Sequence, residues 1–143
     1  MKKYHLGVFT PGWIELILDE LKTIESRFTK TRCAPFNKVR KGDVVYMKES
    51  GGHILGLATV AKVETFEDLT LEKKQQLFKK HHKAIFYNIW VQSSDDLPEK
   101  WRTAKHATLI HLTDPVPFQP PVAFKKDDRR AWVVLDEPLA IGE

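Results

Sequence analysis

The strongest constraint on the fold is a pair of apolar, β-branched segments joined by a glycine-rich turn. The first, Val44–Glu49, follows a Lys-Gly-Asp turn, and the second, Ile54–Phe66, is long enough to be an extended strand. Between them, residues 50–53 read Ser-Gly-Gly-His, a sequence typical of a hairpin turn. The sequence therefore predicts a central β-hairpin, around which an antiparallel sheet must be built.

The N-terminal segment is expected to be a strand followed by a helix. Tyr4–Phe9 reads as a short buried strand, after which Thr10 suits a helix cap and Pro11 the first helical position. Apolar residues then recur at helical spacing and predict one core-facing side: Trp13, Ile14, Ile17, Leu18 and Leu21. After Lys22 the period changes to two, which predicts a strand in residues 23–28.

The second half of the chain is expected to contain one long helix and two further strands. Thr70 is a suitable cap for a helix that reaches about His82 and that Phe86–Val91 would extend. Ala107–Leu112 and Ala131–Leu135 read as strands. The polar stretch Ser93–Lys100 is expected to be a loop or a short turn. The four prolines of Pro115–Pro121 exclude a helix or a central strand in that segment.

These elements predict an α+β fold. The expected count is about six strands, in a mostly antiparallel sheet that could close into a barrel, with two or three helices against it. A chain of 143 residues suits a single domain spanning residues 1–143.

Charge and composition favour some partners and exclude others. The net charge is +4, but residues 1–62 carry +5 and residues 63–143 carry −1. A basic half of this kind is consistent with phosphate-containing partners, RNA or nucleotides among them. No apolar run is long enough to span a membrane, and the single cysteine, Cys33, allows no internal disulfide, so a reducing, cytoplasmic location is expected.

The sequence carries no motif for a metal or a cofactor. No HExxH or CxxC pattern occurs, and His81 and His82 are adjacent and cannot share a helix face, so neither a metal nor a cofactor is expected. The lysine-rich segment Lys79–Lys83 is interpreted as a solvated helix face, with an RNA-backbone contact as the alternative. Cys33 is interpreted as a small apolar residue rather than a nucleophile.

A cluster of charges stands where the first helix gives way to a strand. Lys22, Glu25 and Arg27 lie within six positions, directly after an apolar segment. They could form exposed ion pairs, which contribute little to stability, or a partly buried polar site. Burial of such charges is costly unless they satisfy one another or a ligand, so the second interpretation makes them candidate functional residues.

This cluster resembles the signature of the ASCH domain family, close to G-x-K-x-x-E-x-R. Residues 20–27 read Glu-Leu-Lys-Thr-Ile-Glu-Ser-Arg, in which Lys22, Glu25 and Arg27 match and Glu20 replaces the glycine. The resemblance continues through the Arg40–Val45 turn and through the segments KESGG, ATLIHL and DRRAWVVL. It implies a PUA-like β-barrel whose motif residues line a cleft between the first helix and the barrel, where such domains are thought to bind RNA or nucleotides.

The same resemblance raises an enzymatic alternative. Some small ASCH proteins are amidohydrolases acting on N4-acetylcytidine, with a K-T-I-T-x-R pattern, and others are assigned ribonuclease activity. Here Lys22 and Arg27 match that pattern, but position 25 is glutamate instead of threonine. If the protein is an enzyme, Lys22 and Glu25 are the expected catalytic residues, with Glu25 as the acid or base. A plain interaction module is a third alternative, because fold does not settle function.

The sequence thus predicts an RNA- or nucleotide-binding domain whose partners include no membrane, and it says nothing about protein partners. The residues expected to bind the ligand are Lys22, Thr23, Glu25, Arg27, Lys48, Ser50 and Lys105. Lys30 and Arg32 are expected to form a basic rim that attracts phosphates without selecting a ligand.

Overall fold

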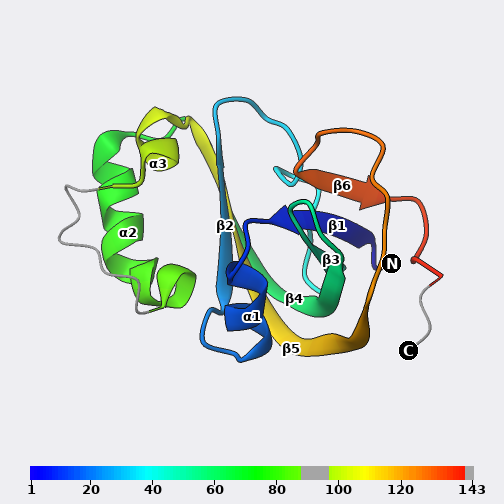
Figure 1. Cartoon of the computed structure of the whole chain (residues 1–143). Coiled ribbons are helices and arrows are strands. Elements are labelled where there is room, and N and C mark those ends of the chain that lie inside the picture. Colours follow the sequence, from blue (N-terminus) through cyan, green and yellow to red (C-terminus); the bar gives the residue numbers. More distant parts are fainter. Residues whose placement is uncertain (88–96, 141–143) are drawn as a thin grey trace.

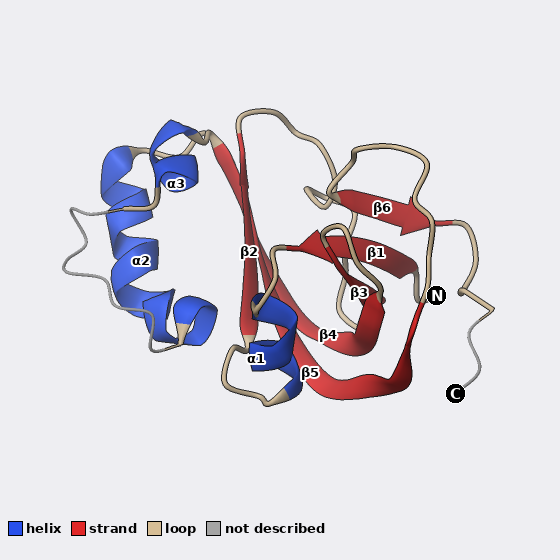
Figure 2. Cartoon of the chain, viewed as in Figure 1, coloured by secondary structure: helices blue, strands red, loops and turns tan. Residues whose placement is uncertain are grey.

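The described part of the chain folds into a six-stranded, strongly curled sheet with three helices (Figures 1 and 2). The structure is a computed structural model and describes residues 1–87 and 97–140. In chain order the elements are β1 (Tyr4–Phe9), α1 (Trp13–Leu18), β2 (Ile24–Thr29), β3 (Val44–Glu49), β4 (Ile54–Phe66), α2 (Leu71–Phe86), α3 (Glu99–Thr103), β5 (His106–Val122) and β6 (Trp132–Leu135).

The sheet confirms the predicted α+β class and its mostly antiparallel pairing. Its strand order is β2-β5-β4-β3-β1-β6, and only the β1–β3 pair is parallel among the pairs of described strands. The central hairpin, β3 with β4, has the predicted bounds. β2 and β6 are the two edges, and no pairing of described residues joins them, so the sheet forms a half-barrel with an open seam.

The first helix is shorter than predicted. It begins at Trp13, and its cap is Gly12 at φ 101° without a side-chain cap, so Thr10 and Pro11 do not open it. Ile14 and Ile17 are buried as expected, but Leu21 is 42% exposed. The reason is that the helix ends at Leu18 and Glu20 takes a positive φ of 60°, which turns Leu21 away from the helical face.

The proline-rich segment is neither a helix nor a central strand, as predicted, but it does belong to the sheet. β5 continues through Pro115–Pro121 to Val122, where it pairs only with β4, because its pairing with β2 ends at His111. One side of this half of β5 therefore has no neighbouring strand in the described sheet, and a residue without an N–H is tolerated there.

The C-terminal helices differ from the prediction in extent. Thr70 caps α2 as expected by accepting from the Lys73 N–H, but the helix continues past His82 to Phe86. The rest of the predicted extension to Val91, and residues 93–96 of the predicted loop, lie outside the described residues. Glu99 and Lys100 begin the short helix α3 instead of ending that loop.

The two helices are held against β2 by stacked aromatic rings. Trp101 of α3 is buried, and its ring lies parallel to that of Phe28 of β2, with centroids 3.8 Å apart. Together α2 and α3 cover β2 on the side away from β1 and β6 (Figure 1). This packing leaves the opposite side of β2 open toward the seam.

On the far side of the seam, a buried hydrogen-bond chain fixes Trp132. Its indole N–H donates to Nδ1 of His5 over 3.1 Å, and His5 Nε2 donates to Asp43 over 2.8 Å. Asp43 also accepts from the main-chain N–H groups of Lys3 and Arg40. Trp132 lies directly over Gly7, where a Cβ atom would come within 2.8 Å of its ring.

We expect Gly7→Ala to lower the free energy of unfolding by about 1–3 kcal/mol, because a methyl group would overpack the Trp132 ring. Urea denaturation measures this. Gly52→Ala is the control, since its added Cβ meets only the flexible side chain of Glu49, and a change within about 0.5 kcal/mol is expected. Equal losses in both variants would contradict the packing argument.

Candidate functional site

A cavity of about 1250 Å³ occupies the open seam of the half-barrel. One wall is formed by β2 with the ends of α2 and α3, and the other by the end of β1 and the loop before β6. Trp13 of α1 and the β3–β4 turn, through Ser50 and Gly51, complete the lining. The first helix contributes Trp13 to this cavity, whereas most of the lining comes from the two sides of the seam.

The structure brings five of the seven predicted site residues to this cavity. Lys22, Glu25, Arg27, Lys48 and Ser50 line it. The other two, Thr23 and Lys105, are exposed and lie outside the described wall of the cavity.

Lys22 is buried and its donors are already in use. Its ammonium donates to the main-chain oxygens of Ile24 and Ile85, each over 2.7 Å, and lies 3.2 Å from Oε1 of Glu25. It also lies 5.3 Å from the centre of the Trp13 ring. An ammonium has three N–H groups, so these partners satisfy it fully. Burial lowers the pKa of Lys22, against the opposing effect of Glu25.

Glu25 lies between the two cations. Its Oε2 is 2.5 Å from Nε of Arg27, while Oε1 faces Lys22. Burial by itself would raise the pKa of this carboxyl, but Arg27 and Lys22 outweigh burial and hold the pKa below its ordinary value. The side chain is 11% exposed and reaches the cavity surface. Glu25 is therefore an ionised hydrogen-bond acceptor at the base of the cavity.

Arg27 spans the seam. Its Nη2 donates to the main-chain oxygen of Val8 in β1 over 3.0 Å, and its Nη1 to that of Ala131 over 3.3 Å. The guanidinium carbon lies 5.0 Å from the ring centres of both Phe9 and Trp132. A side chain thus joins β2 to β1 across the gap that strand pairing leaves open.

The edge of β2 also offers main-chain groups to the cavity. The Leu112 N–H donates to the Thr23 oxygen on the β5 side, whereas the Ile24 oxygen accepts from Lys22 on the opposite side. Because main-chain groups alternate in direction along a strand, Ser26 and Phe28 direct their N–H and C=O groups toward the open side. Both residues line the cavity.

Most of the basic residues at this cavity were not among the residues predicted from the sequence. Among the described residues that line it, eight are basic and three are acidic. Beyond the predicted residues, the basic ones are Lys38, Lys100, Lys126, Arg129 and Arg130. They come from the loop before β3, from α3 and from the loop before β6, so no short motif could reveal them, although the basic pair at 129–130 was a signal.

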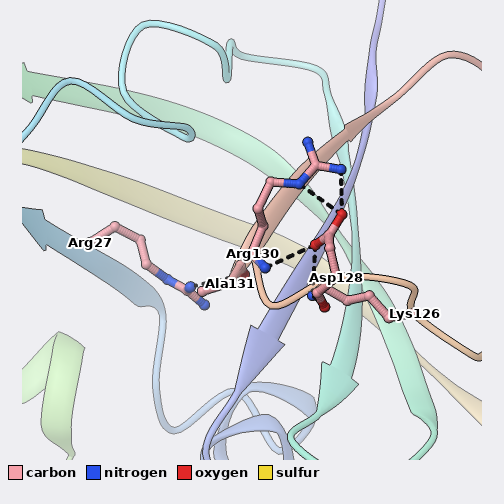
Figure 3. A network of polar contacts seen from close by, with 5 residues as sticks. All are labelled: Arg27, Lys126, Asp128, Arg130 and Ala131. Atoms are coloured by element: carbon pink, nitrogen blue, oxygen red, sulfur yellow. Dashed lines mark hydrogen bonds and ion pairs between the residues drawn. The ribbon is translucent and has the colours of Figure 1, made fainter.

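The loop before β6 is organised around Asp128 (Figure 3). Its carboxylate accepts from the ammonium of Lys126 and from the side chain and main-chain N–H of Arg130. These hydrogen bonds lower the pKa of Asp128. The loop ends at Ala131, whose oxygen holds Arg27, so the network lies beside the seam.

Two predicted rim residues lie elsewhere. Neither Lys30 nor Arg32 is among the described residues lining the cavity, and Arg32 forms an exposed ion pair with Glu67 at 3.0 Å. Cys33 is exposed and lines the cavity instead. Within residues 1–87 and 97–140, no group of three or more histidine, cysteine, aspartate or glutamate side chains is arranged to hold a metal ion.

We expect Lys22→Met to lower the free energy of unfolding by about 3–5 kcal/mol. The substitution removes the ammonium and leaves the oxygens of Ile24 and Ile85 without their donor in a buried site. Lys30→Met makes the same change at an exposed position and should alter stability by less than about 0.5 kcal/mol. Urea denaturation compares the two, and a similar small effect in both would show that Lys22 is not a buried structural cation.

The lowered pKa of Glu25 predicts a pH-dependent contribution to stability. A carboxyl whose pKa is lower in the folded state stabilises the protein above the unfolded-state pKa of about 4.3, and this stabilisation is lost as pH falls through the folded-state value. The stability difference between wild type and Glu25→Gln should therefore shrink below about pH 4. The pKa values of Asp43 and Glu64 are also lowered, but both groups are present in both proteins and cancel in the difference. A pH-independent difference would refute this assignment.

No helix of the described residues is both long and apolar enough to cross a membrane.

Comparisons with known proteins identify the fold. The sequence matches no protein-family model and no curated protein. Among solved structures, ASCH from Zymomonas mobilis is similar over 94% of this chain and 89% of its own, with a TM-score of 0.64 and 15% identity. The hypothetical protein PH0355 is similar over 81% of this chain and 100% of its own, with a TM-score of 0.55 and 16% identity.

Protein PF0455 from Pyrococcus furiosus is similar over 79% of this chain and 97% of its own, with a TM-score of 0.50 and 16% identity. At these identities the likeness concerns the fold alone. The expectation drawn from residues 20–27 is confirmed at that level: the chain shares the fold of ASCH from Zymomonas mobilis.

Proposed function

We propose that the protein binds single-stranded RNA or its nucleotides in the seam cavity. The observation that carries the proposal is a set of cations at the cavity without protein partners. Lys38, Lys100 and Arg129 line it, and none of them pairs with a described residue. Cations left free around a concave surface are suited to phosphate groups, which supply much of the affinity of nucleic-acid complexes.

The dimensions of the cavity favour more than one nucleotide. It follows β2 from Glu25 to Thr29, four residue steps or roughly 13 Å of extended chain. Its volume of about 1250 Å³ exceeds the range of roughly 300–1,000 Å³ typical of small-molecule pockets. A short single-stranded segment fits this shape better than an isolated small metabolite.

Aromatic side chains provide surfaces on which bases can stack. Six aromatic residues line the cavity, and of these Trp13 and Phe86 are only partly buried. Their rings meet edge to face with centroids 6.0 Å apart, beside the ammonium of Lys22. Stacking on aromatic rings is a common way to hold single-stranded bases without regard to their identity.

The motif residues have different roles in this proposal from those the sequence suggested. Lys22 cannot donate to a phosphate or a base without giving up a partner, so its role is to hold Glu25 in place. Arg27 uses three of its five N–H groups within the protein and keeps two for a ligand. Lys48 and Ser50 close the cavity from the β3–β4 turn.

The proposal does not extend to catalysis. A carboxyl with a lowered pKa is a weak general base, and Glu25 is held in that state by two cations. The N–H groups of Lys22 are all engaged, so none is free to stabilise developing negative charge. Support for binding comes from the cavity, from its cations and from the resemblance of residues 20–27 to the ASCH signature.

Replacing the free cations should weaken RNA binding and its dependence on salt. In the triple variant Lys38→Gln, Lys100→Gln, Arg129→Gln, the slope of log affinity against log salt for a short oligouridylate should fall in magnitude by about 2, if each residue meets one phosphate. Fluorescence anisotropy across a salt series measures this slope.

The matched control is Lys73→Gln, Lys79→Gln, Lys80→Gln on α2. These exposed lysines lie outside the described wall of the cavity, and replacing all three removes the same amount of positive charge as the first triple variant. Equal losses in both triple variants would mean that binding is a general effect of net charge. If wild type bound neither the oligouridylate nor any nucleoside monophosphate, the proposal itself would be overturned.

A further inference from the structure

We propose that the cavity selects guanine, with the Glu25 carboxylate accepting hydrogen bonds from the ring N1–H and the 2-amino group of the base. This inference rests on the proposed function and names the base that the site reads. It starts from one observation: the Glu25 carboxylate, which is paired with Arg27, lines the cavity together with Trp13.

The ammonium of Lys22 is fully engaged by the protein, and Arg27 binds Glu25 through Nε, so the Glu25 carboxylate offers acceptor oxygens to the cavity. Lys22 donates its N–H groups to the main-chain oxygens of Ile24 and Ile85 and pairs with Glu25 itself. Each oxygen of Glu25 has one cationic partner, Lys22 at Oε1 and Arg27 at Oε2. A carboxylate oxygen accepts two hydrogen bonds, so both oxygens keep capacity for a donor that comes from the cavity.

Only one of the four RNA bases presents two adjacent donors to a pair of acceptor oxygens. Guanine carries N1–H and the 2-amino group side by side on its Watson–Crick edge. In cytosine and adenine a single amino group is flanked by a ring nitrogen whose lone pair would face the carboxylate, and in uracil one N–H lies between two carbonyl oxygens. Because Glu25 stays ionised, it offers acceptors only, and guanine is the complementary partner.

The open edge of β2 supplies an N–H donor for the third group on the Watson–Crick edge of guanine, the O6 oxygen. The guanine O6 atom follows N1–H and needs an N–H group. Ser26 is next to Glu25 in the chain, lines the same cavity, and directs its main-chain N–H to the open side of β2. Carboxylate and amide together match the acceptor–donor order of guanine.

Basic residues elsewhere in the cavity lining are suited to the phosphate group of a nucleotide. Lys100 is on α3 and lies toward the Thr29 end of β2, because Lys105, just after α3, donates its main-chain N–H to the Thr29 oxygen. Lys100 and the Glu25 carboxylate are thus separated along the strand, whereas Arg129 lies two residues before Ala131, which accepts from Arg27. A ligand with a donor-bearing base at one end and phosphate at the other matches this separation.

The test compares nucleotides on the wild-type protein, so it does not depend on a variant that folds. Isothermal titration calorimetry with the 5′-monophosphates of guanosine, inosine, adenosine, cytidine and uridine gives five dissociation constants. Inosine keeps N1–H and O6 but lacks the 2-amino group. We expect guanosine monophosphate to bind about ten-fold or more tightly than the inosine nucleotide, and more tightly than the other three.

Two variants test whether the preference for the guanosine nucleotide comes from Glu25. Glu25→Gln replaces one acceptor oxygen with a donor and should reduce the guanosine-to-inosine ratio to near one, with thermal unfolding as the check on its fold. Glu99→Gln makes the same change in another residue lining the cavity and should leave the ratio unchanged.

The outcomes separate this inference from the proposed function. Equal affinity for guanosine and inosine nucleotides, or tighter binding of the cytidine nucleotide, overturns guanine selection while leaving nucleotide binding in place. Loss of the ratio in Glu99→Gln as well would also overturn the role of Glu25. If no nucleotide and no oligouridylate binds, the proposed function falls and guanine selection falls with it.

Discussion

The buried carboxylate of Glu25 between Lys22 and Arg27 is the interaction on which the seam of this half-barrel depends. Removing two cations and an anion from water is costly, and the cost is offset only if every donor finds an acceptor. Here the acceptors come from three separate parts of the chain: Ile85 at the end of α2, Val8 in β1 and Ala131 before β6. The ion cluster thereby fixes the position of each of these elements relative to β2.

This arrangement also explains why the cavity combines a rigid base with an adaptable rim. The motif side chains are held in place by partners within the protein: Lys22 is fully engaged, while Arg27 and Glu25 keep some capacity for a ligand. The surrounding cations are on loops and on the short helix α3, and three of them have no partner among the described residues. Base recognition is therefore expected from the preorganised part, and long-range attraction from the rim.

Local patterns predicted the parts of the fold that depend on local chemistry. The β3–β4 hairpin has its predicted bounds because alternating β-branched residues and a Gly-Gly turn determine it within the segment. The second half of β5 was not predicted as a strand because it is rich in proline. Proline is tolerated there because no described strand pairs with that side of β5, and this depends on the arrangement of the whole sheet. The end of α1 was missed because a backbone turn at Glu20 overrides the apolar spacing.

The candidate site shows the same division. The charges of residues 22–27 were visible because they are close in sequence, but their saturation by main-chain oxygens was not, since those oxygens belong to distant strands and helices. Lys38, Lys100 and Arg129 were missed for that reason too. Lys105 and Thr23 were expected at the site from their positions near its motifs, yet exposure and direction place them elsewhere.

The bridge made by Arg27 has a consequence for how this kind of sheet can change. In a fully paired barrel, widening the gap between two strands breaks a whole ladder of main-chain hydrogen bonds. At this seam β2 and β1 are joined through one guanidinium, so their separation there involves no main-chain hydrogen bond of either strand to the other. The contact between β2 and β1 at the seam thus depends on a side-chain bridge and not on a ladder of main-chain hydrogen bonds.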